Sequence, residues 1–323
     1  MSESENIDKD LNQTTGNSIS QPGPVYHIPV LLNETLEGLD LKEDGVYVDC
    51  TFGGGGHSLK ILEKLSDKGR LFAFDQDGDA RKHVPDDPRV IFVASNFRHI
   101  TRFLRLHRAV KVDGILADLG VSSHQFDEPD RGFSIRFEGE LDMRMDKRGD
   151  RTAYDVINTF SEQQLHKIFE QYGEVTNART LARTIVAVRH TTSLRTIQNF
   201  KSALSAVVKG NPNKYFAQVF QALRIEVNDE LSALKDLLQQ MPDLLKPGGR
   251  AAIITFHSLE DRIVKNFFKK GTFEEQDQKD PFGQSTVTPP FKVVTKKPIT
   301  PGDAELKNNP RSRSAKLRIA ERM

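Results

Sequence analysis

Short runs of β-branched and aromatic residues alternate with helically spaced apolar residues through the first third of the chain. The first run, 46–52, ends in four glycines, and apolar residues at helical spacing follow from Leu59 to Leu65. Similar runs predict strands at 70–74, 90–94 and 112–117. Strands that alternate with helices are typical of an α/β fold with a parallel sheet.

After the fourth run the pattern changes to helices and later returns to strands. The middle region predicts helices at 161–172, 176–190, 193–209, 215–227 and 229–244. A strand at 250–256 then resumes the sheet, and Ser258 with Asp261 matches a capping box for a helix at 262–270. Strands at 291–296 and 315–320 are expected to close the sheet as a hairpin-like edge.

This order predicts one α/β domain that a helical segment interrupts. We expect a discontinuous domain at 25–135 and 228–323, with a helical substrate-recognition insert at 136–227 after the fourth strand. The first 24 residues are rich in Ser, Asn, Gln, Asp and Glu and lack an apolar core. They are interpreted as a disordered tail and not as a signal peptide.

Residues able to bind a ligand follow four of the expected strands. These are Gly53 to His57, Asp75, Phe97 and Asp118. Ligands in open α/β sheets bind outside the carboxyl ends of the strands. Glycines let a backbone approach a ligand closely, and a carboxylate after the second strand is placed to accept hydrogen bonds from two ribose hydroxyls. We therefore expect a nucleoside-containing cofactor at this edge of the sheet, which we call the rim.

The glycine loop favours one class of cofactor. A dinucleotide fingerprint requires a third glycine, but Ser58 holds that place after Gly53 and Gly55. A cofactor with a ribose and no phosphates fits better, and S-adenosylmethionine is the common one. A nicotinamide oxidoreductase and a glycine turn with no ligand are the weaker alternatives.

The composition limits the kinds of partner, compartment and binding site that we expect for this chain. The chain has 323 residues and a net charge of +1, so any basic surface for nucleic acid must be local. The only cysteine, Cys50, excludes internal disulfides and suits a reducing, cytoplasmic location. No apolar stretch is long enough to span a bilayer, and the nine histidines show no spacing of a tight zinc site. We predict no membrane association and no metal site.

Several ordered motifs resemble the MraW-type small-subunit rRNA cytosine-N4 methyltransferase family. The resemblance covers roughly residues 26 to 323. It rests on the segments 27–34, 49–58, 113–123, 131–134, 141–146, 172–174, 220–225, 227–231, 256–262 and 309–315. Of these, Asp113 to Ser123 is the most specific. Two departures concern substrate contacts: relatives often show a His-Pro-Ala-Thr-Arg pattern where this chain has Asn211 to Val219, and His124 stands where many have proline.

The resemblance implies a class I, Rossmann-like methyltransferase sheet with a helical insert. It also implies S-adenosylmethionine as donor and N4 methylation of a decoding-centre cytidine. The family's cofactor contacts carry over onto Gly55, Gly56, His57, Asp75, Phe97, Asp118 and Gln125, and the glycine pattern adds Gly53. The partner would be small-subunit ribosomal RNA or the assembled subunit. The oligomeric state stays open, with a homodimer as one option.

Methylation of an exocyclic amine needs alignment and an acceptor for the amine proton. The loop of Asp118, Ser122 and Ser123 occupies the place after the fourth strand where many amino-methyltransferases hold that acceptor. Asp118 is a candidate for this role or for holding the cofactor, and the resemblance favours the cofactor. Methylation at cytosine C5 needs a cysteine nucleophile, and Cys50 lies inside the first strand, where a packing role is expected.

Local basic clusters are the candidates for RNA contact, because Arg and Lys bind phosphates without reading sequence. The candidate substrate residues are Arg131, Phe133, Arg144, Arg224, His257, Arg311 and Arg313. Core packing for Phe133, helix capping for His257 and ion pairing for Arg311 and Arg313 are the alternatives. A noncatalytic ribosome-assembly factor on the same fold is the competing function.

Overall fold

The computed structural model describes residues 29–273 and 289–323, so the expected disordered tail lies outside the described residues. A mixed sheet of seven strands has the order β3-β2-β1-β4-β5-β7-β6. Its strands are β1 (Val46–Asp49), β2 (Arg70–Phe74), β3 (Val90–Val93), β4 (Val112–Asp118), β5 (Leu245–Thr255), β6 (Phe291–Val293) and β7 (Lys316–Arg322). The first five are parallel, and β7 runs antiparallel to β5 and β6. The α/β class and the late edge hairpin are therefore confirmed.

Helices cover both faces of the sheet because side chains alternate sides along each strand. Residues Phe72, Ile115 and Ile253 pack with α3 (Ile100–Leu106), α10 (Glu230–Leu244) and α11 (Ser258–Lys270). Their neighbours Leu71, Leu116 and Ile254 pack with α1 (Leu32–Leu39) and α2 (Gly56–Leu62) on the other face. The two sets interleave along the strands, so the sheet is buried on both sides. No helix in the described residues is long and apolar enough to cross a membrane.

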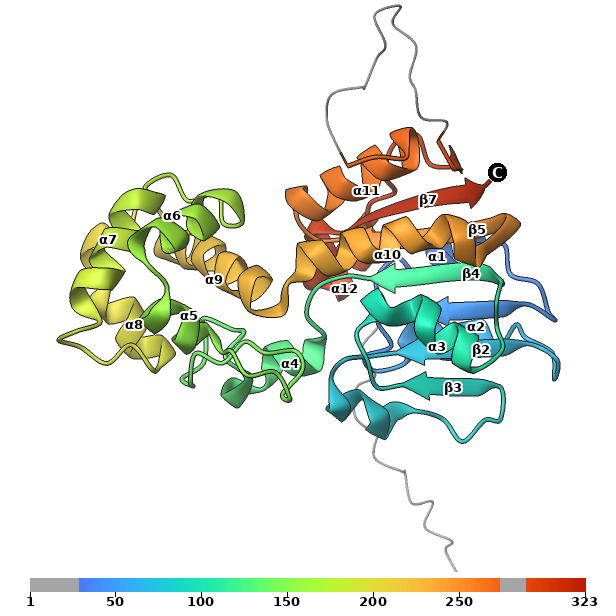
Figure 1. Cartoon of the computed structure of the whole chain (residues 1–323), viewed down its shortest axis with the longest axis horizontal. Helices are drawn as coiled ribbons and strands as arrows, with labels where there is room; N and C mark the ends of the chain where they lie inside the picture. Colours follow the sequence, from blue (N-terminus) through green and yellow to red (C-terminus); the bar gives the residue numbers. More distant parts are fainter. Residues whose placement is uncertain (1–28, 274–288) are drawn as a thin grey trace, which may run out of the picture.

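A separate helical body stands beside the carboxyl ends of the strands (Figure 1). Its helices are α4 (Ser123–Asp127), α5 (Ala153–Thr159), α6 (Glu162–Gln171), α7 (Ala178–Val188), α8 (Ile197–Ala203) and α9 (Pro212–Asn228). These helices have their own core, which includes Leu141, Phe169, Phe200 and Phe220. Asp229, at a φ of 49°, makes the turn from α9 into α10, which returns to the sheet.

Three predicted elements differ most in extent. The helix expected at 193–209 is shorter and corresponds to α8. It starts after the Thr196 N-cap, because Leu194 is buried ahead of that cap. It ends where Leu204 leaves helical geometry, and a short 3-10 turn follows at Ser205–Val207. The strand expected at 250–256 begins at Leu245, which pairs with Val112. Helix α11 begins at Ser258 and not at residue 262.

The cap of α11 also differs from the predicted one. His257, not Ser258, is the N-cap: its ring accepts the N–H of Glu260, and the Glu260 carboxylate accepts the N–H of His257. The strand before it leaves His257 in extended geometry, which is the backbone state of an N-cap residue.

Candidate active site

The ends of β1, β2 and β4 are joined by hydrogen bonds. The N–H of Asp118 donates to the Thr51 hydroxyl over 2.7 Å, and the N–H of Gly53 donates to the Asp75 carboxylate over 2.7 Å. A second Asp75 oxygen accepts the N–H of Asp77 at 2.8 Å. The structure therefore brings Gly53, Asp75 and Asp118 together at one edge of the sheet, on the side where the helical body stands (Figure 1).

The glycine loop is shaped by its own packing. Gly53 and Gly55 have φ values of 53° and 79°, in the region that favours glycine. A Cβ on Gly55 would lie 2.9 Å from the Phe52 ring, and one on Gly56 would lie 2.4 Å from Pro29. By contrast, a Cβ on Gly54 would have no heavy atom within 4 Å. Gly55 and Gly56 are thus required by the fold, and Gly54 faces open space.

This difference gives a matched pair of variants. Gly55→Ala is expected to lower the melting temperature, since it combines a positive φ with a clash and such strain costs on the order of 1–3 kcal/mol. Gly54→Ala should leave the melting temperature unchanged, because the added methyl group meets nothing. Thermal unfolding of the two purified variants measures this. Equal melting temperatures would contradict the packing role of Gly55.

Asp118 is the least satisfied carboxylate of the rim. Its Oδ1 is buried without a hydrogen-bond partner in the described structure, although the side chain as a whole is 23% exposed. Burial first, and then the charges of Asp49, Glu260 and Glu305, raise the pKa of Asp118 well above its usual range. The excess of negative potential around the Asp118 carboxylate is complementary to a cation.

His57 lies between two of these carboxylates. Its buried ring donates from Nε2 to the Val30 carbonyl over 3.0 Å, and its Nδ1 lies 3.9 Å from Asp118 Oδ2. Asp49 is buried behind it and accepts from Ser58 Oγ at 2.7 Å and from the Thr51 N–H at 3.0 Å. The ring of His57 is therefore part of the charged network and is not turned out to solvent.

Ser122 and Gln125 are engaged in the start of α4. The Ser122 hydroxyl accepts the Gln125 N–H, and the Gln125 amide oxygen accepts the Ser122 N–H, which makes a capping box. The Gln125 amide nitrogen donates to Asp77 at 2.8 Å. These bonds fix the loop from Asp118 to Ser123 against the segment after β2. Ser123 and Phe97 lie half-buried at the same edge.

Several candidate RNA residues have internal partners instead. Arg131 is buried, with its guanidinium 2.7 Å from Asp77 and bonded to the carbonyls of Arg144 and Met145. Phe133 is buried in the core of the helical body. For these two residues the prediction of RNA contact is corrected, because neither side chain reaches the surface.

The other candidates differ in how far they are engaged. Arg144 and Arg224 form paired hydrogen bonds with Asp142 and Glu230, and His257 is the buried cap of α11. Arg311 pairs with Asp127 of α4 and lies over the Phe126 ring, so the ion-pair alternative describes it. Arg313 is exposed.

Sequence reasoning missed three residues of this site. Asp49 accepts a hydrogen bond from Ser58, Asp77 forms an ion pair with Arg131, and Asp79 forms an ion pair with Lys147. The signal was available, because Asp49 directly precedes the glycine turn and Asp77 and Asp79 follow Asp75 at alternate positions. Cys50 is buried in the core, as expected, and burial raises the pKa of its thiol.

Comparison with known proteins identifies the family. Residues 24–323 match the MraW methylase family. A ribosomal RNA small subunit methyltransferase H of Parabacteroides distasonis is 53% identical over 300 residues, covering 92% of this chain and 98% of the relative. The protein of the same name from Flavobacterium johnsoniae is 54% identical, with the same coverage of both chains.

Solved structures are more distant. The crystal structure of an rRNA methylase from Streptococcus thermophilus covers 90% of this chain and 95% of its own, at 10% identity and a TM-score of 0.40. That similarity is too low to support a functional conclusion. The family match spans nearly the whole sequence, and the relatives above are more than half identical to it. The chain therefore belongs to the MraW methylase family.

Proposed function

We propose that this protein transfers the methyl group of S-adenosylmethionine to the N4 amine of a cytidine in the decoding centre of small-subunit ribosomal RNA. Membership of a methylase family and the names of the relatives support methyl transfer to small-subunit rRNA. The N4 position and the decoding centre come from the motif resemblance. The observation that carries the proposal is the unpartnered Asp118 oxygen at the joined strand ends.

The rim fits this cofactor. When bound, S-adenosylmethionine supplies a methyl group on a positively charged sulfur and carries an ammonium group and a ribose. Asp118, with Asp49 and Glu260 nearby, provides the negative potential that a cation requires. Each Asp75 oxygen already accepts one backbone N–H and retains a second lone pair for a ribose hydroxyl. Gly54 leaves space beside the loop.

The other requirement for methyl transfer is the alignment of the reacting atoms. The N4 lone pair is delocalised into the cytosine ring, so the amine is a poor nucleophile and must lie in line with the methyl carbon and sulfur. The capping box at Ser122 fixes the loop that follows Asp118. Bound S-adenosylmethionine would supply a methyl group whose bond to sulfur breaks as the N–C bond forms, and an oxygen of this loop would accept a hydrogen bond from the amine, whose proton then passes to solvent. The helical insert forms a wall for the RNA.

Two measurements test the proposal. Calorimetry should show that the purified protein binds S-adenosylmethionine and not NAD. Small subunits from a strain lacking this protein should then accept labelled methyl groups, and the label should elute as N4-methylcytidine after nuclease digestion. Binding to the subunit with no methyl transfer would favour the noncatalytic assembly factor. Label in 5-methylcytidine would contradict the proposed reaction.

A further inference from the structure

The segment from Phe97 to Val112 is strongly basic. It contains five Arg or Lys residues and two histidines in sixteen positions, with no Asp or Glu, in a chain whose net charge is only +1. It covers the turn after β3, helix α3 and the turn into β4. A concentration of one charge in a nearly neutral protein is a local electrostatic feature that the fold does not require.

Four of these cations are exposed and have no carboxylate partner among the described residues. We name Arg102, Arg105, Arg108 and Lys111 the basic ridge. All four are exposed, and in residues 29–273 and 289–323 no carboxylate forms an ion pair with any of them. Lys111 donates only to the main-chain carbonyl of Asp243. Their charges are therefore available to a partner.

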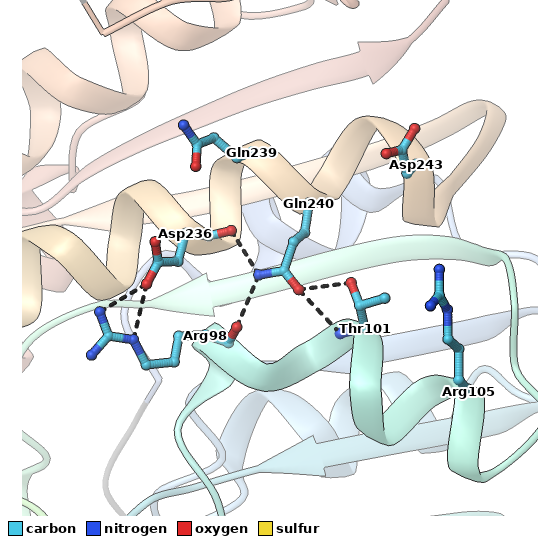
Figure 2. A pocket seen from close by; sticks show the side chains of 7 residues that line it. All are labelled: Arg98, Thr101, Arg105, Asp236, Gln239, Gln240 and Asp243. Carbon is cyan, nitrogen blue, oxygen red and sulfur yellow. Dashed lines mark hydrogen bonds and ion pairs between the residues drawn. The ribbon is translucent and has the colours of Figure 1, made fainter.

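Arg98 shows the contrast. A pocket of about 470 Å³ lies between α3 and α10, and Figure 2 shows Arg98 bonded there to Asp236. Arg98 also pairs with Asp229, so its charge is used within the protein. Arg105 lines the same pocket farther along α3 and faces Asp243 without an ion pair among the described residues. Arg98 is thus paired with carboxylates of the protein, whereas the residues of the basic ridge that follow it are not paired with any carboxylate among the described residues.

The ridge has a regular spacing and a definite direction. Its members lie three residues apart in the sequence. Arg102 and Arg105 lie on α3, where this spacing puts Cβ atoms roughly 5–6 Å apart, and Arg108 and Lys111 follow in the turn between α3 and β4. Helix α3 starts at Ile100, just after the turn that holds Phe97 at the proposed cofactor site. Lys111 lies directly before Val112, where β4 starts. The ridge therefore runs from the catalytic edge toward the opposite edge of the sheet.

Arg108 has a conformation that favours another residue. Its φ is 58°, in the left-handed region at the end of α3, where glycine is the usual choice. An arginine there is less favourable for the fold than glycine would be. Packing and backbone geometry thus give no reason for a long cationic side chain at this place.

We infer that the basic ridge is a second contact surface for the phosphate backbone of RNA, separate from the methyl-transfer site. The inference rests on the proposed function, because the substrate is then an RNA much larger than the site. Arg and Lys neutralise phosphates and so supply affinity without sequence information. Leu106 and Val110, 71% and 64% exposed, lie between the cations and offer apolar contact to sugars or bases. RNA flanking the target would then lie along α3.

The test removes three charges without disturbing the fold. The variant Arg102→Ala, Arg105→Ala, Arg108→Gly relieves the strained φ and should unfold no earlier than the wild type. The control Lys64→Ala, Lys265→Ala, Lys269→Ala removes three exposed lysines from α11 and the turn after α2. Affinity for purified small ribosomal subunits is measured from about 50 to 200 mM salt, a range over which phosphate contacts lose much of their strength.

The ridge variant should lower the log–log salt slope by about 2 to 3, since each lost contact contributes roughly 0.7 to 0.9. Across this fourfold rise in salt, the wild type should therefore lose affinity by a factor roughly 20 to 40 times larger than the factor for the variant. The KM for subunits should rise, with kcat and the affinity for S-adenosylmethionine unchanged. The lysine control should keep the wild-type slope and KM.

Three outcomes would overturn the inference. One is a wild-type slope and KM in the ridge variant, and another is an equal change in the lysine control. The third is an unaltered slope with lost binding to phosphatidylserine vesicles, which would assign the ridge to a membrane. In each of these cases the wild type still methylates RNA. Failure of the proposed function is recognised separately, because the wild type itself would then transfer no methyl group.

Discussion

Replacing Asp118 by asparagine is expected to weaken S-adenosylmethionine binding by about 10- to 100-fold, the effect of losing a hydrogen bond to a charged group, about 1.5–3 kcal/mol. The same change should raise the melting temperature of the cofactor-free protein. Burial and neighbouring carboxylates raise the pKa of Asp118, so its ionised form destabilises the folded state. Asparagine removes that charge. Calorimetry and thermal unfolding of one variant measure both effects.

The matched control lies on the same strand. Asp113 is buried at the opposite end of β4, where Lys246 and the Val46 N–H hold its carboxylate and keep its pKa low. Asp113→Asn should therefore lower the melting temperature and leave cofactor affinity unchanged. If Asp118→Asn retained wild-type affinity but lost kcat, Asp118 would act on the amine and not on the cofactor. A lower melting temperature in Asp118→Asn would contradict the electrostatic account.

The second large effect is expected for Asp75→Ala, which should also weaken cofactor binding by about 10- to 100-fold. The carboxylate is expected to accept the ribose hydroxyls, and it also accepts the N–H groups of Gly53 and Asp77. Its loss therefore removes contacts with the cofactor and loosens the glycine loop. Calorimetry on folded protein measures the affinity. An unchanged dissociation constant would remove Asp75 from the site.

Cofactor binding should also depend on pH through this residue. Burial raises the pKa of Asp75 to about 6, against the lowering effect of its backbone hydrogen bonds. Since a raised carboxyl pKa favours protonation of the folded protein, this group's contribution to stability is greatest at low pH and is lost as pH rises through about 6. Binding should change in the opposite direction, because hydroxyls prefer the ionised carboxylate. Affinity should fall as pH decreases through this range, and Asp75→Asn should remove that part of the dependence.

The sheet, and the meeting of Gly53, Asp75 and Asp118 at one edge of it, could be predicted because their signals are local. Runs of β-branched residues, the four glycines and acidic residues directly after strands are visible within a few positions. The partners of the arginines could not be predicted in this way. Arg131 pairs with Asp77 across 54 positions, and Arg311 pairs with Asp127 across 184. Such pairs depend on how loops from distant parts of the sequence meet, and no local pattern records that.

The most direct test of the account is the nucleoside content of small-subunit rRNA. Mass spectrometry would compare a strain lacking this protein with the same strain carrying the wild-type gene. The account predicts that an N4-methylated cytidine disappears from decoding-centre fragments of the first strain and returns with the gene. An N4-methylated cytidine that persists without the protein would contradict the central claim, as would loss of a methyl group at another atom.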